Sequence, residues 1–326
     1  MTILFIGTGE IGVPALRWLV EHSGHRVTGV VCQPDKPAGR KQTLTPPATK
    51  SVALAAGLPV FQPERINDPA ALDALLTPPP DLIVVMAYGQ FLPRRLREGA
   101  RLGCINLHAS LLPRWRGASP IQSALAAGDP ETGITVMHVV REMDAGDTLL
   151  AESTPIRPED TGQSLHDRLA DLAPKTLARA LPLLENGTAP RHPQPPDRVT
   201  HCAKLNRTAA RLDWSQPAVE LERLIRAYHP WPGTHTLLPA DHGGRLLKIF
   251  PPTQVVPLPA DPGQPDAHRP GQIVAVDRES VVVATGHLAL RLTSLQTEGQ
   301  KRLPAREFLA GTRLEVGQLL GETRGS

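Results

Sequence analysis

The sequence DLIVVMAYGQFLPRRLREGARLGCINLHAS, residues 81–110, joins two almost unbroken apolar runs through an arginine-rich stretch. Each run is short, and its apolar residues do not alternate with polar ones, which is typical of a strand buried on both faces of a parallel sheet. Three earlier runs have the same character: TILFIG (2–7), RVTGVVC (26–32) and LPVF (58–61). Helix-like stretches lie between them, among them PALRWLVEHSG (14–24) and PPATKSVALAAG (46–57). This alternation predicts an α/β fold with a doubly wound, Rossmann-like sheet.

The chain beyond this sheet predicts a second domain. A long amphipathic stretch, residues 161–184, ends at Asn186-Gly187, a good C-terminal stop for a helix. The next stretch, TAPRHPQPPDRVTH (188–201), is rich in proline and poor in apolar residues, as a semi-rigid connector would be. We therefore expect a catalytic domain over 1–189, a linker over 190–207 and a second domain over 208–326.

Short apolar runs with turn signals dominate the second domain. They include THTLLP (234–239), RLLKIF (245–250), GQIVAV (271–276) and SVVVATGHLALRLTSLQ (280–296). Such a series predicts a small, OB-like β-barrel. The proline-rich residues 251–271 predict a surface loop.

Composition limits the class of protein. With Pro 35 and Gly 27 among 326 residues, the chain stays below the combined share of roughly 25 to 30% that is typical of low-complexity proteins. Three cysteines without a C-x-x-C pair favour neither a disulfide framework nor a zinc site, so we expect no metal. No secretory signal or membrane-length apolar run is visible, so we expect a cytoplasmic location and no membrane partner. The net charge of +3 falls entirely after residue 203, a weak sign of a polyanionic partner.

The motif GTGEIG (7–12) has the G-x-G-x-x-G spacing of a dinucleotide site. A nicotinamide site would also need an acidic residue at the end of the second strand to hold a ribose hydroxyl. That strand ends instead in Cys32-Gln33, and Asp35 follows Pro34 in a loop. We therefore expect a tight strand-to-helix turn and no nicotinamide.

Asn106 and His108 are candidates for chemistry because they lie near the end of a buried strand. Residues two apart on a strand point to the same face. An amide can donate to developing negative charge, and an imidazole can move a proton near neutral pH. Asp144, on a turn after another apolar run, is suitably placed to orient His108. Alternatively, the first two residues only satisfy a polar strand end, and Asp144 only forms a turn.

Several motifs resemble one known family. CINLHASLLPRWRGASPIQ (104–122), ETGITVMHVVREMDAGD (131–147) and VVMAYGQFLP (84–93) are similar to the core of the formyltetrahydrofolate-dependent transformylases. These Rossmann-like enzymes move a formyl group from 10-formyltetrahydrofolate onto an amine. The resemblance continues through QPDKPAGRKQTLTPP (33–47) and IRAYHPWPGT (225–234), and over the whole chain it is to members that act on methionine carried by initiator tRNA.

The resemblance implies roles for particular residues. It gives Asn106, His108 and Asp144 as the catalytic trio. The folate site it implies consists of Ser110, Leu111, Leu112 and Pro113. It also implies that the loop carrying Arg40 and Lys41 contacts tRNA, although this loop has fewer lysines than is usual for the family. Family members of this kind are expected to be monomers.

Three other functions remain open at this stage. A sugar-nucleotide formyltransferase would use the same trio and folate donor with another acceptor. The glycine motif leaves a nicotinamide-dependent dehydrogenase as a more distant alternative. A non-catalytic RNA-binding protein is the third, but it would give the trio no purpose.

Overall fold

The computed structural model describes residues 1–39, 42–259 and 268–322, and the chain forms two compact units. The first unit comprises Met1–Pro120, Glu131–Pro155 and Leu165–Ala203. The second comprises Ile121–Pro130, Ile156–Ser164 and the chain from Lys204 onward.

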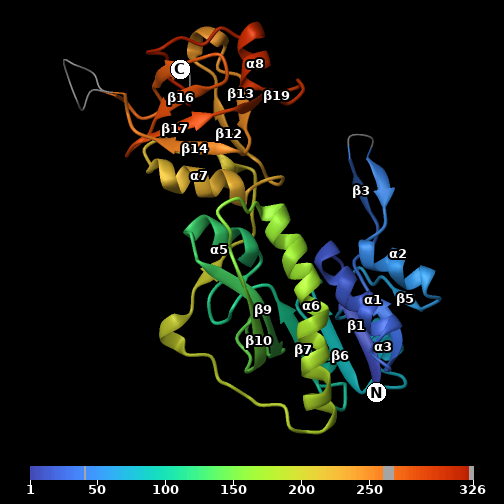
Figure 1. Ribbon diagram of the computed structural model, residues 1–326. Helices are drawn as coiled ribbons and strands as arrows, with labels where there is room; N and C mark the ends of the chain where they lie inside the picture. Colours follow the sequence, from blue (N-terminus) through green and yellow to red (C-terminus); the bar gives the residue numbers. More distant parts are fainter. Residues whose placement is uncertain (40–41, 260–267, 323–326) are drawn as a thin grey trace. The chain divides into compact units, whose positions relative to one another are not determined.

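A seven-stranded sheet forms the centre of the first unit (Figure 1). Its order is β10 (Thr148–Pro155), β9 (Glu131–His138), β7 (Cys104–His108), β6 (Leu82–Met86), β1 (Thr2–Gly7), β2 (Arg26–Val31) and β5 (Val60–Phe61). The strands from β7 to β5 pair in parallel. Strand β9 pairs antiparallel with β7 on one side and with β10 on the other. The predicted doubly wound α/β sheet is confirmed. In the described part of the chain up to residue 185, the α-helices are α1 (Val13–Glu21), α2 (Ala48–Ala55), α3 (Pro69–Leu75), α4 (Arg94–Arg97), α5 (Pro120–Ala127) and α6 (Gly162–Glu185).

Alternation along β1 divides its side chains between the two faces of the sheet. Leu4 and Ile6 belong to a buried cluster that includes Leu72 and Leu75 of α3 and Leu96 of α4. Burying a side chain of this size is worth roughly 1.5 to 3 kcal/mol. Apolar contact with these two helices therefore covers one face of the parallel strands.

The glycine motif serves the packing of β1 against β6. A Cβ atom on Gly7 would lie 2.6 Å from the carbonyl oxygen of Met86, so only glycine permits this close approach. The backbone N–H groups of Thr8 and Gly9 both donate to the carbonyl oxygen of Ala87, at 3.1 and 3.3 Å. Both N–H groups are therefore bonded to the backbone that follows β6, which supports the interpretation of the motif as a tight turn.

The second unit contains two four-stranded antiparallel sheets. One has the order β12 (Thr234–Leu237), β13 (Leu246–Ile249), β18 (Ser294–Thr297) and β19 (Leu303–Pro304). The other has the order β14 (Thr253–Val256), β17 (Ala289–Leu292), β16 (Val281–Ala284) and β15 (Ile273–Val276). Helices α7 (Ala218–Ala227) and α8 (Ala305–Gly311) also belong to this unit, as does nearly all of α5. The second domain, predicted as a small OB-like β-barrel, is therefore present as a domain of antiparallel strands, which are divided between two sheets.

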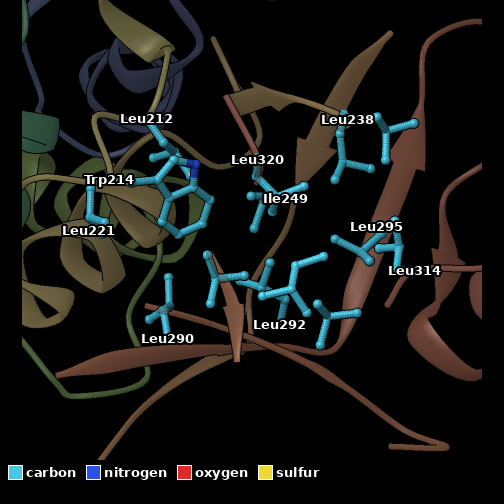
Figure 2. Packing of buried hydrophobic residues seen from close by; sticks show 14 of the residues in the cluster. Leu212, Trp214, Leu221, Leu238, Ile249, Leu290, Leu292, Leu295, Leu314 and Leu320 are labelled. Carbon is cyan, nitrogen blue, oxygen red and sulfur yellow. The ribbon is translucent and has the colours of Figure 1, made fainter. Parts of the chain in front are cut away.

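One apolar core joins the two sheets of the second unit (Figure 2). Trp214 is 5% exposed and packs with Leu221 of α7, and its indole nitrogen donates to the Thr236 hydroxyl at 3.0 Å. Ile249 of β13 and Leu292 of β17 belong to the same cluster, so both sheets contribute side chains to it. The buried indole thus has both its apolar and its polar requirements met.

Two features of the loops bear on the predictions. Arg40 and Lys41, predicted to contact tRNA, lie outside the described residues. The short strands β3 (Lys36–Ala38) and β4 (Thr43–Thr45) pair on either side of them. Residues 251–271 were expected to form a loop, but β14 lies within them and pairs with β17. None of the helices in the described part of the chain is long and apolar enough to cross a membrane.

Candidate functional site

Strand β7 places Asn106 and His108 on one face of the sheet. Asn106 lies opposite Met137 of β9, and His108 lies opposite Thr135. The strand forms because its other positions are apolar and fully buried between β6 and β9, as Ile105 is. Alternation along the strand then directs both polar side chains to the same side.

The loop that follows β9 brings Asp144 to this face. Because β9 is antiparallel to β7, its last residue, His138, lies opposite Ile105, at the far end of β7 from His108. The loop must therefore return along the sheet. Gly146 permits the return, since a Cβ atom there would overlap the carbonyl group of His138. Asp144 itself has a φ of +52°, a conformation that aspartate tolerates better than most residues.

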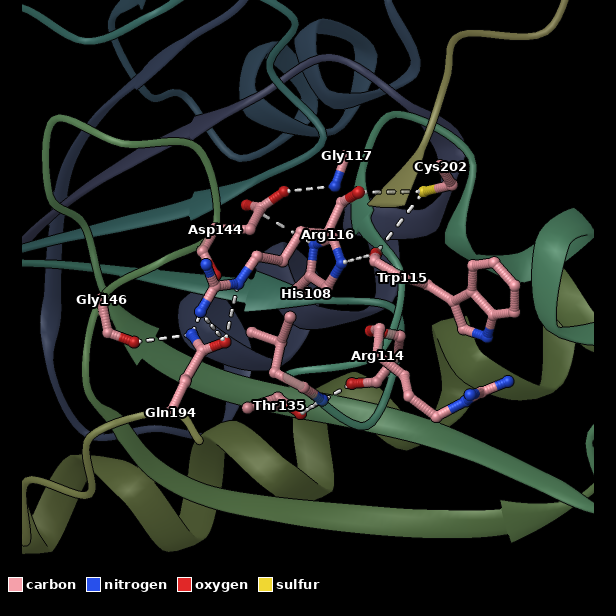
Figure 3. Close-up of polar contacts among 12 residues, drawn as sticks. His108, Arg114, Trp115, Arg116, Gly117, Thr135, Asp144, Gly146, Gln194 and Cys202 are labelled. Atoms are coloured by element: carbon pink, nitrogen blue, oxygen red, sulfur yellow. Dashed lines mark hydrogen bonds and ion pairs between the residues drawn. The ribbon is translucent and has the colours of Figure 1, made fainter. Parts of the chain in front are cut away.

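His108 and Asp144 face each other, and both are largely buried (Figure 3). The Nδ1 atom of His108 lies 3.7 Å from Oδ1 of Asp144, and the two side chains are 7% and 14% exposed. The other carboxylate oxygen accepts a hydrogen bond from the backbone N–H of Gly117 at 2.9 Å. The other ring nitrogen, Nε2, donates to the carbonyl oxygen of Trp115 at 2.8 Å, which fixes the plane of the ring.

Asn106 shares the face but not these contacts. Its side chain is partly exposed and makes no hydrogen bond to any residue that the structure describes. An amide that is held on a strand and has unused donors can bind an oxygen that gains negative charge. The structure therefore brings His108 and Asp144 together and leaves Asn106 available beside them.

Residues 110–113, predicted to form the folate site, make a tight loop directly after β7. The hydroxyl of Ser110 is buried and donates to the carbonyl oxygen of Arg114 at 2.6 Å. Thr135 of β9 holds the same loop by two hydrogen bonds. Its hydroxyl donates to the carbonyl oxygen of Ser110 at 2.6 Å and accepts from the backbone N–H of Leu112 at 3.1 Å. Ser110 thus shapes the loop from inside.

The other three loop residues are partly exposed and line an open depression. Its lining consists of Leu111, Leu112, Pro113, Arg114, Asp197, Arg198, Val199 and Thr200. One wall is apolar, and the charges of Arg114, Arg198 and Asp197 sum to a net positive charge, a combination that suits a flat ring system carrying an acidic tail. The residues present are therefore compatible with a reduced folate.

The second wall of the depression comes from a segment that the sequence analysis treated as a linker. Residues 188–203 lie along the first unit, where β11 (His201–Cys202) pairs in parallel with β8 (Arg116–Gly117). The hydroxyl of Thr200 also accepts a hydrogen bond from Trp115 N at 2.9 Å. We call residues 188–203 the strap.

The sequence does not predict that the strap packs on the first unit, because its contacts involve main-chain groups and isolated polar side chains. It has no apolar periodicity, and its prolines favour an extended segment whether or not that segment is bound. Gln194 is a strap residue whose side chain reaches the Asp144 loop (Figure 3). No sequence signal identifies it.

The thiol of Cys202 lies at this site and donates to the carbonyl oxygens of Trp115 and Arg116, at 3.5 and 3.4 Å. Burial raises the pKa of the Cys32 thiol to about 11, although the nearby Lys50 opposes the shift. All three cysteines are free and buried. Within the described ranges, no three His, Cys, Asp or Glu side chains gather in a way that could hold a metal ion.

Family models match both units of the chain. The formyl transferase model matches residues 1–181, and the model of the formyl transferase C-terminal domain matches residues 204–313. The first match includes β7, the Asp144 loop and most of α6, whereas the strap lies between the two matches.

Curated relatives match over nearly the full length. A protein of Akkermansia muciniphila called methionyl-tRNA formyltransferase is 46% identical over 95% of this chain and 96% of its own. Relatives with the same name from Symbiobacterium thermophilum and Geobacillus thermodenitrificans are 48% and 43% identical, over 97% and 98% of this chain and 94% and 98% of theirs.

Solved structures with a similar fold are more distant in sequence. HypX from Aquifex aeolicus, solved with tetrahydrofolic acid, has a TM-score of 0.58 and is 18% identical over 94% of this chain. This chain spans only 46% of that one. The sugar 3N-formyl transferase WlaRD has a TM-score of 0.60 and is 12% identical, over 92% of this chain and 99% of its own. The fold agrees with the sequence matches, and the chain belongs to the formyl transferase family.

Proposed function

We propose that this protein transfers the formyl group of 10-formyltetrahydrofolate to the α-amino group of methionine on initiator tRNA, giving N-formylmethionyl-tRNA for translation initiation. The observation that carries the proposal is the match to methionyl-tRNA formyltransferases at 43 to 48% identity across both units. The paired His108 and Asp144 side chains support it, because acyl transfer to an amine requires proton movement.

Each member of the trio has a proposed role. The neutral amine attacks the formyl carbon, and the carbonyl oxygen becomes an oxyanion that the Asn106 amide stabilises. His108 accepts a proton as the amine reacts and returns one to the departing folate nitrogen. Since Nε2 is engaged by Trp115, Nδ1 is the nitrogen that would exchange the proton, with Asp144 as its ionic partner.

The folate donor is proposed to bind at the loop of Ser110, Leu111, Leu112 and Pro113. Three of these residues line the open depression, and Ser110 holds the loop in shape. Folate supplies the formyl group, and the loop supplies an apolar wall that orients it next to His108.

The proposed tRNA contacts include Arg40 and Lys41, which follow β3 in sequence. The charge distribution supports a polyanionic partner, because the net charge of +3 falls after residue 203. We further propose that the protein acts as a monomer in the cytoplasm, where charged initiator tRNA is available.

A sugar-nucleotide acceptor is the second candidate, since sugar formyltransferases are among the structural neighbours. Their sequence identity to this chain is only 12 to 18%, whereas the tRNA-named relatives exceed 40%. The tRNA acceptor is therefore favoured.

One assay distinguishes the two acceptors. The protein is incubated with radiolabelled 10-formyltetrahydrofolate and either initiator methionyl-tRNA, elongator methionyl-tRNA or a nucleotide-linked amino sugar. We expect label in the initiator tRNA at a rate well above that of either control. Preferential labelling of the sugar would replace the proposed function with its alternative, and labelling of none of the acceptors would refute both.

A further inference from the structure

We propose that Gln194, on the strap, is a positioning residue for the reaction: its carboxamide holds the loop that presents Asp144 to His108. The inference rests on the proposed function, because it concerns the rate of that reaction. Among the described residues, no hydrogen bond joins Gln194 to His108, and Gln194 does not line the depression at the folate loop, so it would act through its neighbours.

The carboxamide connects two loops of the site (Figure 3). Its nitrogen donates to the carbonyl oxygens of Asp144 and Gly146, each at 2.8 Å. Its oxygen accepts from Nε and Nη2 of Arg116, at 3.0 and 2.8 Å. Gln194 therefore joins the Asp144 loop to the residue that precedes Gly117, whose backbone N–H binds the Asp144 carboxylate.

The donors and acceptors at this position require an amide. Two carbonyl oxygens need hydrogen-bond donors, while a guanidinium needs an acceptor, and a carboxamide supplies two of each. A glutamate could bind Arg116 but would place a negative charge against two carbonyl oxygens. A lysine or arginine would donate to the carbonyls but repel Arg116.

The loop depends on this support because its conformation is not intrinsically favoured. Asp144 has a positive φ, which is unfavourable for a non-glycine residue. Among the described residues, the carbonyl oxygens of Asp144 and Gly146 accept hydrogen bonds from Gln194 and from no other side chain.

Backbone contacts on both sides of Gln194 fix its position. His192 and Thr148 exchange backbone hydrogen bonds of 3.0 and 2.9 Å. On the other side, the N–H of Arg116 donates to the carbonyl oxygen of Thr200 at 2.9 Å. The Gln194 side chain thus extends from a segment whose backbone is fixed. A residue that orients a catalytic group without touching the substrate needs such support.

The first test measures steady-state formylation of initiator methionyl-tRNA by Gln194→Met, which keeps the length of the side chain and removes its polar groups. Outer residues that orient a reactive group contribute roughly 10- to 100-fold, so we expect kcat to fall on the order of 10-fold. We expect KM for folate and for tRNA to stay within about 2-fold, since the reacting molecules are not contacted. The matched control is His192→Ala, on the same strap, whose exposed side chain should be dispensable.

A second variant separates the two halves of the contact. Gln194→Glu keeps the acceptor for Arg116 and loses the donors to the Asp144 loop, so we expect a loss of kcat at least as large as for Gln194→Met. Full activity in the glutamate variant would show that only the tether to Arg116 matters and would overturn the proposal. If the methionine variant does not fold, the kcat of Gln194→Glu relative to the unaltered protein still tests the proposal.

A double-mutant cycle tests whether Gln194 acts through Asp144. In an Asp144→Asn background, where the carboxylate is already lost, Gln194→Met should change the single-turnover rate by less than about 2-fold. An equal loss in both backgrounds would indicate a general structural role and refute the inference. If the unaltered protein formylates methionyl-tRNA and Gln194→Met is unimpaired, only this inference fails; if the unaltered protein is inactive, the proposed function itself fails.

Discussion

Asn106 offers a simple test of the proposed oxyanion site. Its amide shares a face of β7 with His108 and has no hydrogen-bond partner among the residues that the structure describes. Removing one oxyanion donor typically lowers turnover on the order of 10²-fold or more. We expect Asn106→Ala to lower kcat by that factor, measured by formylation of saturating methionyl-tRNA.

Asn186→Ala is the matched control, because Asn186 is exposed just beyond the end of α6. It should retain normal turnover. If Asn106→Ala also did so, while folded and able to bind tRNA, Asn106 would have no part in stabilising the oxyanion.

The cysteines provide a second test at this scale. Burial raises the pKa of Cys32 to about 11 and also raises the pKa of Cys104, so at pH 8 the Cys32 thiolate fraction is about 10⁻³. We expect the native protein to react slowly with a thiol-specific reagent and the unfolded protein to react fully at three sites. Rapid labelling of Cys32 or Cys104 in the native protein would contradict this burial.

His108 and Asp144 could be predicted from sequence, but Gln194 could not. An imidazole at the end of an apolar strand and a carboxylate on a glycine-containing turn are recognisable by residue type and position. Gln194 acts on backbone carbonyls, which every residue carries, and therefore leaves no pattern in the sequence. The antiparallel direction of β9 was also unknown, and without the returning loop its end would lie far from His108.

At the scale of elements, the pairing of β8 with β11 depends on a glycine. Gly117 has a φ of +123°, and a Cβ atom there would lie 2.1 Å from the carbonyl oxygen of Cys202. Gly117→Ala must therefore displace the strap and disturb the N–H group that binds Asp144. We expect a loss of stability of roughly 2 kcal/mol or more in urea unfolding, together with a fall in kcat on the order of 10-fold.

Gly187→Ala is the control that separates backbone strain from steric overlap. Gly187 has a φ of +68°, but a Cβ atom there meets nothing within 4 Å. It should cost about 1 kcal/mol and leave kcat unchanged. Equal effects of the two variants on kcat would show that the pairing of β8 and β11 does not support the site.

The elements that were predicted correctly have a strong hydrophobic pattern, and those that were missed do not. The parallel strands are almost wholly apolar, and α6 has a long amphipathic pattern ending at a glycine. Strand β14 has only four residues between prolines, and its identity depends on pairing with β17, far along the chain. The strap similarly gains its conformation from the surface that it contacts.

At the scale of the whole molecule, each unit has its own core, and family models match both. The first unit carries the paired His108 and Asp144. Residues 204–326, the largest segment of the second unit, carry a net charge of +3. This division is consistent with chemistry in one unit and recognition of a polyanion with help from the other.

Acid unfolding of the first unit should depend on Asp81, which precedes β6 and anchors the start of β1. Its carboxylate accepts hydrogen bonds from the N–H and hydroxyl of Thr2 and from Arg101, and these contacts lower its pKa from 3.8 to about 2. Because the folded-state pKa is the lower one, the stabilisation is complete above pH 3.8 and is lost as the pH falls through about 2.

We therefore expect Asp81→Asn to be less stable than the unaltered protein by a constant amount above about pH 4, with the difference vanishing as the pH approaches 2. Urea unfolding at a series of pH values measures this difference. Asp73→Asn, which removes an exposed ion pair with Arg95, should have little effect at any pH. A difference for Asp81→Asn that grew on acidification would contradict the assigned contacts.

The central claim is that His108 and Asp144 act together in formyl transfer to methionyl-tRNA. Its most direct test is the single-turnover rate of transfer, with enzyme in excess over charged initiator tRNA, for the unaltered protein and for Asp144→Asn. We predict a rate constant lowered on the order of 10² to 10³-fold, with tRNA affinity within about 2-fold of the unaltered protein. A rate constant near that of the unaltered protein would contradict the claim.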